Sequence, residues 1–148
     1  MNPTADEKFM TLALDLARAA LERGDTPVGS VVVRDGKVIG EGVEAVRTKL
    51  DPAAHAEIVA LQDACRGLAS LDLTGCVLYT TAEPCLMCSF AIRSTRISRV
   101  VIGKPTPHVG GFSSKYPILK NPEIPGWREP PAISSGVMEE ACAALFAR

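Results

Sequence analysis

The chain has 148 residues, 47% of them apolar, and a net charge of −1. This length and apolar fraction predict a single domain over residues 1–148 with a hydrophobic core. A near-neutral balance is not the basic footprint of a nucleic-acid-binding domain, and no run of about 18 apolar residues predicts a membrane span. The first seven residues lack the basic start and apolar core of a signal peptide. Five cysteines without a secretory mark favour metal ligands and buried thiols over disulfides, so we expect a cytoplasmic protein.

The N-terminal third predicts a helix followed by a hairpin. Apolar residues recur at helical spacing over residues 6–23, and Gly24 ends that helix. A strand follows over residues 27–33, Asp35-Gly36 is a strong hairpin turn, and the returning strand covers residues 37–43.

The middle of the chain predicts two helices around a strand. Asp51 is expected to cap a helix with Pro52 at its first position, and this helix runs to about Cys65. A buried strand covers residues 76–80. The second helix opens at Pro84-Cys85 and ends near Arg93 or Ser94.

The C-terminal third predicts a strand over residues 99–103, a proline-rich loop over 104–130, a short strand over 132–134 and a closing helix over 137–146. Strands that alternate with helices imply an α/β fold, a three-layer α/β/α sandwich. The opening hairpin makes its sheet mixed.

Two short motifs carry the chemistry. His55 lies two residues before Glu57, and Cys85 and Cys88 are three apart at a helix start, where both sulfurs share one face and the helix dipole favours thiolates. A structural zinc site takes four protein ligands, whereas this set offers three and leaves one position for water. Glu57 points about 200° from His55 on a helix, so it suits a proton carrier beside the metal better than a ligand.

Each motif alone has an ordinary explanation. A single Cys-x-x-Cys is often a structural half-site or a redox pair, and a His-x-Glu on a helix is usually on the surface. Together and in this order, they match the signature of zinc deaminases, H-x-E followed by P-C-x-x-C.

The chain resembles the cytidine deaminase superfamily in five segments: 26–29, 38–42, 51–58, 81–88 and 96–103. Within the superfamily, it resembles the branch of bacterial tRNA adenosine deaminases, guanine deaminases and fungal-type cytosine deaminases. The resemblance implies a five-stranded sheet flanked by helices, a homodimer and one Zn²⁺ per chain. It also implies that zinc-activated water attacks the ring carbon bearing the amino group while Glu57 carries the proton.

The resemblance also implies substrate contacts. The backbone around Ala56 and Glu83 is expected to hold the water and the leaving amine, and Val28 to pack against the ring unless it is an ordinary core valine. Glu44 stands where the family usually has an asparagine, and a carboxylate accepts hydrogen bonds only. Glu44 therefore either contacts N–H groups of the substrate, or points to solvent or pairs with Arg47.

The loop after residues 99–103 also departs from the family pattern. His108 is predicted to stack on or bond a ring, or else to be merely solvated. Phe112, with Trp127, either closes over a flat substrate or pins the loop to the core.

We expect a zinc-dependent hydrolase that releases ammonia from a small heterocyclic amine, a nucleobase or nucleoside of purine type. One alternative is deamination of the wobble adenosine of tRNA to inosine, and a lesser one is an inactive zinc-stabilised binding module. Six basic residues could form a tRNA rim, but the net charge favours an ordinary solvated surface: Arg93, Arg96, Arg99, Lys104, Lys115 and Lys120.

Overall fold

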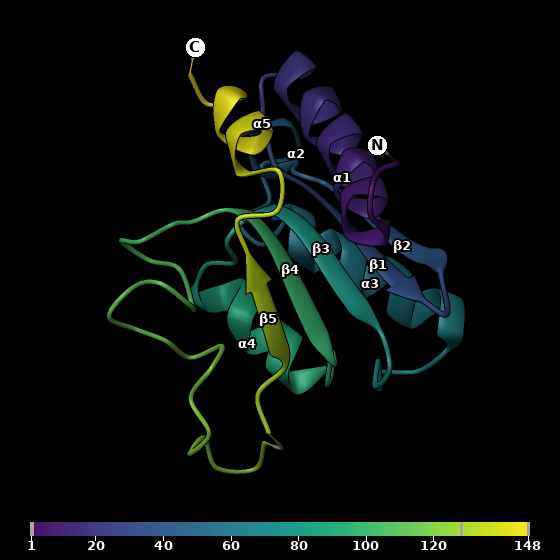
Figure 1. The fold of residues 1–148 in the computed structure, drawn as a ribbon, viewed down its shortest axis with the longest axis vertical. Helices are drawn as coiled ribbons and strands as arrows, with labels where there is room; N and C mark the ends of the chain where they lie inside the picture. The colour runs from purple at the N-terminus through teal and green to yellow at the C-terminus, as the bar shows by residue number, and fades with distance from the viewer. Residues whose placement is uncertain (1, 128, 148) are drawn as a thin grey trace.

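The computed structural model describes residues 2–127 and 129–147. Its sheet has five strands in the order β2-β1-β3-β4-β5 (Figure 1). The strands are β1 (Gly29–Arg34), β2 (Lys37–Val43), β3 (Val77–Ala82), β4 (Arg99–Lys104) and β5 (Ala132–Ser135). The helices are α1 (Ala5–Glu22), α2 (Val46–Lys49), α3 (Ala56–Leu68), α4 (Leu86–Ser94) and α5 (Glu139–Ala144).

The sheet is mixed, as the hairpin predicts. β1 pairs antiparallel with both β2 and β3, whereas β3, β4 and β5 run parallel. Because the carboxyl ends of parallel strands meet at one edge of a sheet, the segments that follow β3 and β4 come together there. This edge carries the site described below.

Two hydrophobic layers confirm the three-layer α/β/α fold (Figure 1). On one face, Met10 and Leu14 of α1 and Cys142 of α5 are buried with Val31 of β1. The neighbouring Val32 points to the other face, where α3 and α4 cover the sheet. The adjacent residues Val31 and Val32 of β1 therefore pack into the two hydrophobic cores on opposite faces of the sheet.

The helix predicted to begin at Pro52, with Asp51 as its cap, begins four residues later at Ala56, so that boundary is wrong. The Asp51 carboxylate accepts from the Ala53 N–H at 2.9 Å and its carbonyl accepts from the Ala54 N–H, which closes a turn rather than a helix. Aspartate forms such local turns as readily as it caps helices. His55 is instead the N-cap residue of α3.

α3 lies unusually close to β2, and Gly42 allows this. A Cβ at Gly42 would collide with the backbone of Ala56 and Ala60. The missing side chain lets the first turn of α3 rest on the end of β2, which places His55 and Glu57 beside the carboxyl edge of the sheet.

Within the part of the chain that the structure describes, none of the helices is both long and apolar enough to cross a lipid bilayer.

Candidate metal and catalytic site

The three predicted metal ligands come from two helix N-termini at the carboxyl edge of the sheet. His55 is the N-cap of α3, Cys85 is the N-cap of α4, and Cys88 lies in the first turn of α4. Neither N-cap side chain makes a capping hydrogen bond, so both can serve another partner. The free N–H groups at a helix start favour thiolate ligands.

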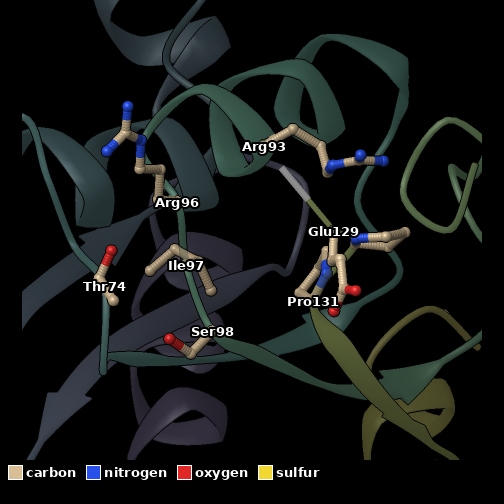
Figure 2. A pocket seen from close by; sticks show the side chains of 8 residues that line it. Thr74, Arg93, Arg96, Ile97, Ser98, Glu129 and Pro131 are labelled. Atoms are coloured by element: carbon tan, nitrogen blue, oxygen red, sulfur yellow. The ribbon is translucent and has the colours of Figure 1, made fainter. Parts of the chain in front are cut away.

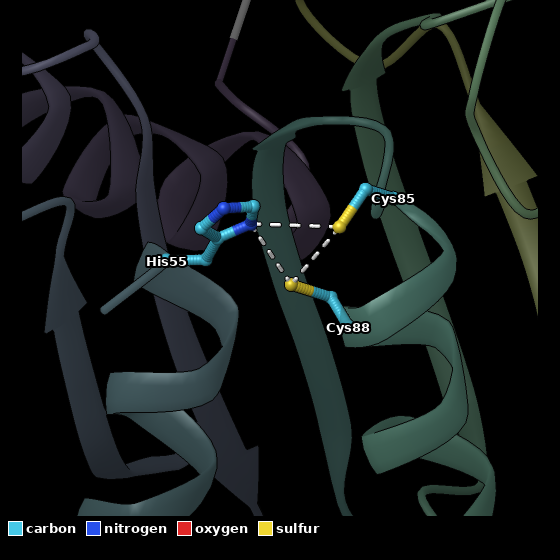
Figure 3. A group of neighbouring side chains, drawn as sticks. All are labelled: His55, Cys85 and Cys88. Carbon is cyan, nitrogen blue, oxygen red and sulfur yellow. Dashed lines mark hydrogen bonds between the residues drawn. The ribbon is translucent and has the colours of Figure 1, made fainter. Parts of the chain in front are cut away.

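The triad has the dimensions of a tetrahedral zinc site (Figure 3). His55 Nδ1 lies 3.5 Å from Cys85 Sγ and 3.4 Å from Cys88 Sγ, and the two sulfurs are 3.7 Å apart. Zinc bonds of about 2.3 Å to sulfur and 2.0–2.1 Å to nitrogen predict tetrahedral edges of about 3.5 Å and 3.8 Å. His55, Cys85 and Cys88 are therefore positioned to bind one Zn²⁺ and leave a fourth position open.

The local electrostatics also prepare Cys85 as a ligand. The neighbouring Cys88 thiol, and then His55, lower the pKa of Cys85 to about 4, so this residue is a thiolate at neutral pH. The Cys85 sulfur in turn raises the pKa of His55 to about 9, and contact with Cys85 together with burial raises the pKa of Cys88. Binding of a dication would release the protons that His55 and Cys88 hold.

Glu57 lines the same cavity as the metal ligands His55 and Cys85, a cavity of about 370 Å³. Its side chain is only 4% exposed, and burial raises its pKa to about 8. A carboxyl group with a pKa near neutrality can both take up and release a proton. Glu57 therefore has the surroundings that the predicted proton carrier requires.

Glu44 also faces this cavity and is 6% exposed, so it does not point to solvent. Its Oε1 accepts from the Ala56 N–H at 3.3 Å, and burial raises its pKa. Among the ion pairs that the described residues form, none joins Glu44 to Arg47. Glu44 thus caps the helix whose own N-cap residue, His55, is reserved for the metal, and it occupies the Ala56 N–H that we expected to hold water.

Val28 forms a small buried cluster with Ala56 and Ala82 and lines the cavity. These residues give the cavity an apolar stretch of wall, where a flat ring can pack. Its position is therefore consistent with the predicted ring contact.

Glu83 organises the loop that follows β4. Its carboxylate accepts from the backbone N–H groups of Thr106, Phe112 and Ser113 at 3.2, 3.0 and 2.9 Å, and from the Ser113 hydroxyl at 2.6 Å. The side chain is buried, and these donors replace the water that it loses. The carboxylate thus holds the loop, while the residue as a whole still borders the cavity.

The two predicted substrate contacts in the loop after β4, His108 and Phe112, lie in different surroundings. His108 lines the cavity and is exposed, so it is accessible to a ligand. The ring of Phe112 packs against the hydrophobic core between the sheet and helices α3 and α4, with Lys120 Nζ 4.8 Å from its centroid. Phe112 therefore fits the alternative in which it pins the loop to the core.

Three further residues line the cavity that the sequence analysis did not connect with the substrate: Thr26, Ala82 and Phe146. Lys104, named for the basic rim, and Thr106 of the loop after β4 line it as well. Lys104 ends β4, and Phe146 follows α5. Lys104 Nζ lies 4.5 Å from the centre of the Phe146 ring. No local pattern could have revealed this pair, because the two residues meet only when α5 docks on β4.

Most of the predicted basic rim lies elsewhere. Arg99 is paired with Asp6, and Arg96 with Asp72. Arg93 is buried and donates to the Ile118 and Asn121 carbonyls. Of the six basic residues, Lys104 is the one that lines the catalytic cavity.

A second cavity, of about 420 Å³, lies at the amino ends of the parallel strands (Figure 2). Thr74, Ser98 and Pro131 precede β3, β4 and β5 there. Figure 2 shows the Arg93 and Arg96 side chains pointing away from each other.

Comparison with known proteins gives the family. A family model described as the cytidine and deoxycytidylate deaminase zinc-binding region matches residues 3–104, so the chain belongs to this family. As a member of a deaminase family with three ligands positioned for zinc, it is a zinc-dependent hydrolase of carbon–nitrogen bonds. We therefore set aside the alternative of an inactive binding module.

Individual relatives refine this result. The tRNA-specific adenosine deaminase of Aquifex aeolicus (strain VF5) is 41% identical over 118 residues, 80% of this chain and 78% of that protein. A structure solved in studies of A-to-I editing by tRNA:A34 deaminases superposes with a TM-score of 0.87 and 38% identity, covering 93% of this chain and 98% of that one. A guanine deaminase structure from Bacillus subtilis is 40% identical but covers 71% of this chain and 66% of that one, with a TM-score of 0.65.

These similarities contradict our main expectation of a free base, a nucleoside or another small heterocycle as substrate. The tRNA deaminase relatives are 41% and 38% identical over most of both chains. A guanine deaminase structure from Nitrosomonas europaea also covers 95% of this chain and 82% of that one, with a TM-score of 0.80, but it is 27% identical. The expectation relied on the near-neutral net charge and on Glu44. Net charge describes the whole surface and not the few contacts at one site, and Glu44 is engaged by the Ala56 N–H.

Proposed function

We propose that this protein deaminates an adenosine of tRNA to inosine, with the wobble adenosine as its target. The proposal rests on one observation: His55 and Cys85 of the metal-ligand triad share a cavity with the buried Glu57, in a chain that matches a tRNA:A34 deaminase structure over 93% of its length. A tRNA substrate also fits the cytoplasmic location that we expected.

In this proposal, His55, Cys85 and Cys88 would hold the Zn²⁺, which when bound would supply Lewis-acid activation of a water molecule at neutral pH. Glu57 accepts one proton of the attacking water and delivers it to ring nitrogen N1. It then takes the remaining proton from the oxygen now bound to C6 and gives it to the departing amine. A bond from C6 to oxygen forms, the bond from C6 to nitrogen breaks, and ammonia leaves. Adenosine and water thus give inosine and ammonia, with Glu57 returned to its starting form.

The other cavity residues position the base. Val28 and its alanine neighbours offer a flat apolar wall, and His108 borders the entrance. Glu44 keeps the first turn of α3 in place through Ala56 and presents its second oxygen as an acceptor. A base that reaches this depth has to leave its stack, as single-stranded loop bases do readily.

The test is to incubate the zinc-loaded protein with an anticodon stem-loop RNA and to digest the product for nucleoside analysis. We expect inosine at the wobble position, and no inosine from a stem-loop with guanosine at that position. Free adenosine is expected to react far more slowly, because it lacks the contacts that hold the RNA. Absence of inosine from the stem-loop would refute the proposed function.

We also propose a homodimer. α4 exposes three large apolar side chains, Leu86, Met87 and Phe90, on one stretch of surface. Such surfaces usually mark interfaces, and two-fold dimers are the commonest assembly. Light scattering should give twice the chain mass for the wild type and the chain mass for Phe90→Lys, and a wild type with the mass of one chain would refute the dimer.

A further inference from the structure

The catalytic cavity has a floor and a mouth of different character. Its floor holds the nearly inaccessible Glu44 and Glu57, while His108 and Phe146 at its mouth are exposed, Phe146 by 38%. A volume of about 370 Å³ falls in the range of about 300–1,000 Å³ that receives drug-sized ligands. The mouth can therefore contact parts of a substrate that extend beyond the reacting base.

Lys104 brings a positive charge to this mouth. It lies at the carboxyl end of β4, and its ammonium group sits against the Phe146 ring at 4.5 Å. Among the ion pairs of residues 2–127 and 129–147, none involves Lys104. The nearest acids of the cavity are engaged elsewhere, Glu83 with the loop and Glu44 with Ala56.

The close packing of α5 on β4 brings Phe146 to Lys104. A Cβ at Gly103 would collide with the Cys142 side chain of α5, so the glycine before Lys104 lets α5 lie directly on β4. The Val137 N–H also donates to the Ile102 carbonyl at 3.1 Å, which ties the approach to α5 to the same strand. Phe146 thereby reaches Lys104, and a cation held over an aromatic face loses part of its freedom.

We propose that Lys104, held by the Phe146 ring, binds the phosphate next to the reacting nucleotide and so anchors the RNA strand at the cavity mouth. This proposal rests on the proposed function, because the phosphate belongs to the RNA substrate proposed above. Phosphate contacts by lysine position a nucleic acid without reading its sequence. Phe146 acts as a positioning residue, and Lys104 is the binding residue.

The test measures how salt weakens binding of an anticodon stem-loop RNA. Fluorescence anisotropy is used with zinc-loaded protein in the Glu57→Ala background, which prevents turnover, while inosine formation is followed with Glu57 present. One lost phosphate contact on a single strand is expected to lower the slope of log affinity against log salt by about 0.7. The same slope corresponds to about fourfold weaker binding of Lys104→Ala at 0.15 M salt.

Two variants and one matched control accompany Lys104→Ala. Lys104→Arg keeps the charge and should keep the slope, and Phe146→Ala should fall between wild type and Lys104→Ala, because the amine remains but loses its support. Lys120 sits over Phe112 in the same manner, away from the cavity, so Lys120→Ala should match the wild type.

The outcomes separate this inference from the proposed function. Inosine formation by the wild type combined with a wild-type slope for Lys104→Ala would overturn the inference and leave the function intact. An equal loss of slope in Lys120→Ala would also overturn it, since the effect would then reflect general charge. No inosine from the wild type would overturn both.

Discussion

The two ends of the parallel strands hold cavities of similar size, about 370 Å³ at the carboxyl ends and about 420 Å³ at the amino ends, and both contain charged residues. At the carboxyl ends, side chains from α3, α4 and the strand termini converge on one point. At the amino ends, Arg93 bonds to loop carbonyls and Arg96 pairs with Asp72.

The difference shows that convergence, and not volume or charge, marks the functional end. Parallel strands bring successive loops and helix N-termini together at their carboxyl ends, where the helix dipoles favour anionic ligands. The buried Glu57 has a pKa raised to about 8 and lies in the cavity with the metal ligands His55 and Cys85, a combination typical of catalytic sites.

The largest expected effect comes from the metal ligands. Cys88→Ser, or removal of zinc by a chelator, should abolish inosine formation, because the triad then lacks a ligand or the ion itself. Metal analysis should find one zinc per wild-type chain, and added zinc should restore the chelated enzyme. Cys65→Ser, which changes a half-buried thiol outside the triad, should keep both zinc and activity.

Glu57→Ala should lower turnover by about 10²–10⁴-fold, the usual contribution of a general acid–base group, while zinc stays bound. Rates of inosine formation and zinc content measure this directly. As a control at the other end of the sheet, Glu129→Gln changes an acid that lines the amino-end cavity and should leave the rate unchanged. Full activity of Glu57→Ala would exclude the proton-carrier role.

Glu83→Gln should destabilise the protein by about 2–3 kcal/mol, because an amide N–H₂ group would face several N–H donors where a carboxylate accepts. Because the loop carries His108, KM for the RNA should also rise. Urea unfolding and steady-state kinetics measure the two effects. Glu140→Gln, at an exposed acid, should change neither, and an unchanged stability of Glu83→Gln would show that the loop does not depend on this carboxylate.

The smallest effect concerns an ion pair at the amino end of β4. Arg99 lowers the pKa of Asp6 below its usual 3.8, through bonds of 3.0 and 2.6 Å, and the Tyr79 hydroxyl donates to the same carboxylate. A lowered folded-state pKa adds stability above the unfolded pKa, and that stability is lost as the pH falls through the folded value. Asp6→Asn should therefore cost about 1 kcal/mol at pH 7, since the pair is partly exposed, and progressively less below about pH 4.

Unfolding measured from pH 7 to pH 3 tests this prediction. Asp15→Asn removes an exposed pair with Arg18 and should have little effect at any pH. A cost of Asp6→Asn that does not change with pH would mean that packing, and not the charge, accounts for it.

The sequence by itself determined the chemistry of the site. The spacing of His55, Glu57, Cys85 and Cys88 predicted the zinc triad and the acid beside it. Zinc binds particular ligand types, and this sequence places them at the starts of two helices. The family resemblance placed Glu44 and His108 near the cavity and implied five strands, and strand patterning predicted the mixed sheet. Such features depend on short-range periodicity and on local ligand chemistry.

The tertiary structure alone decided which contacts the residues around the site make. Asp51 lies in a turn instead of at a helix cap, and Glu44 accepts a hydrogen bond from Ala56. Phe112 packs against the core, and Lys104 lies over the ring of Phe146. Each choice depends on which groups from distant segments satisfy a buried donor or fill a space. Local propensity cannot decide this, because the competing partners meet only after the helices have docked on the sheet.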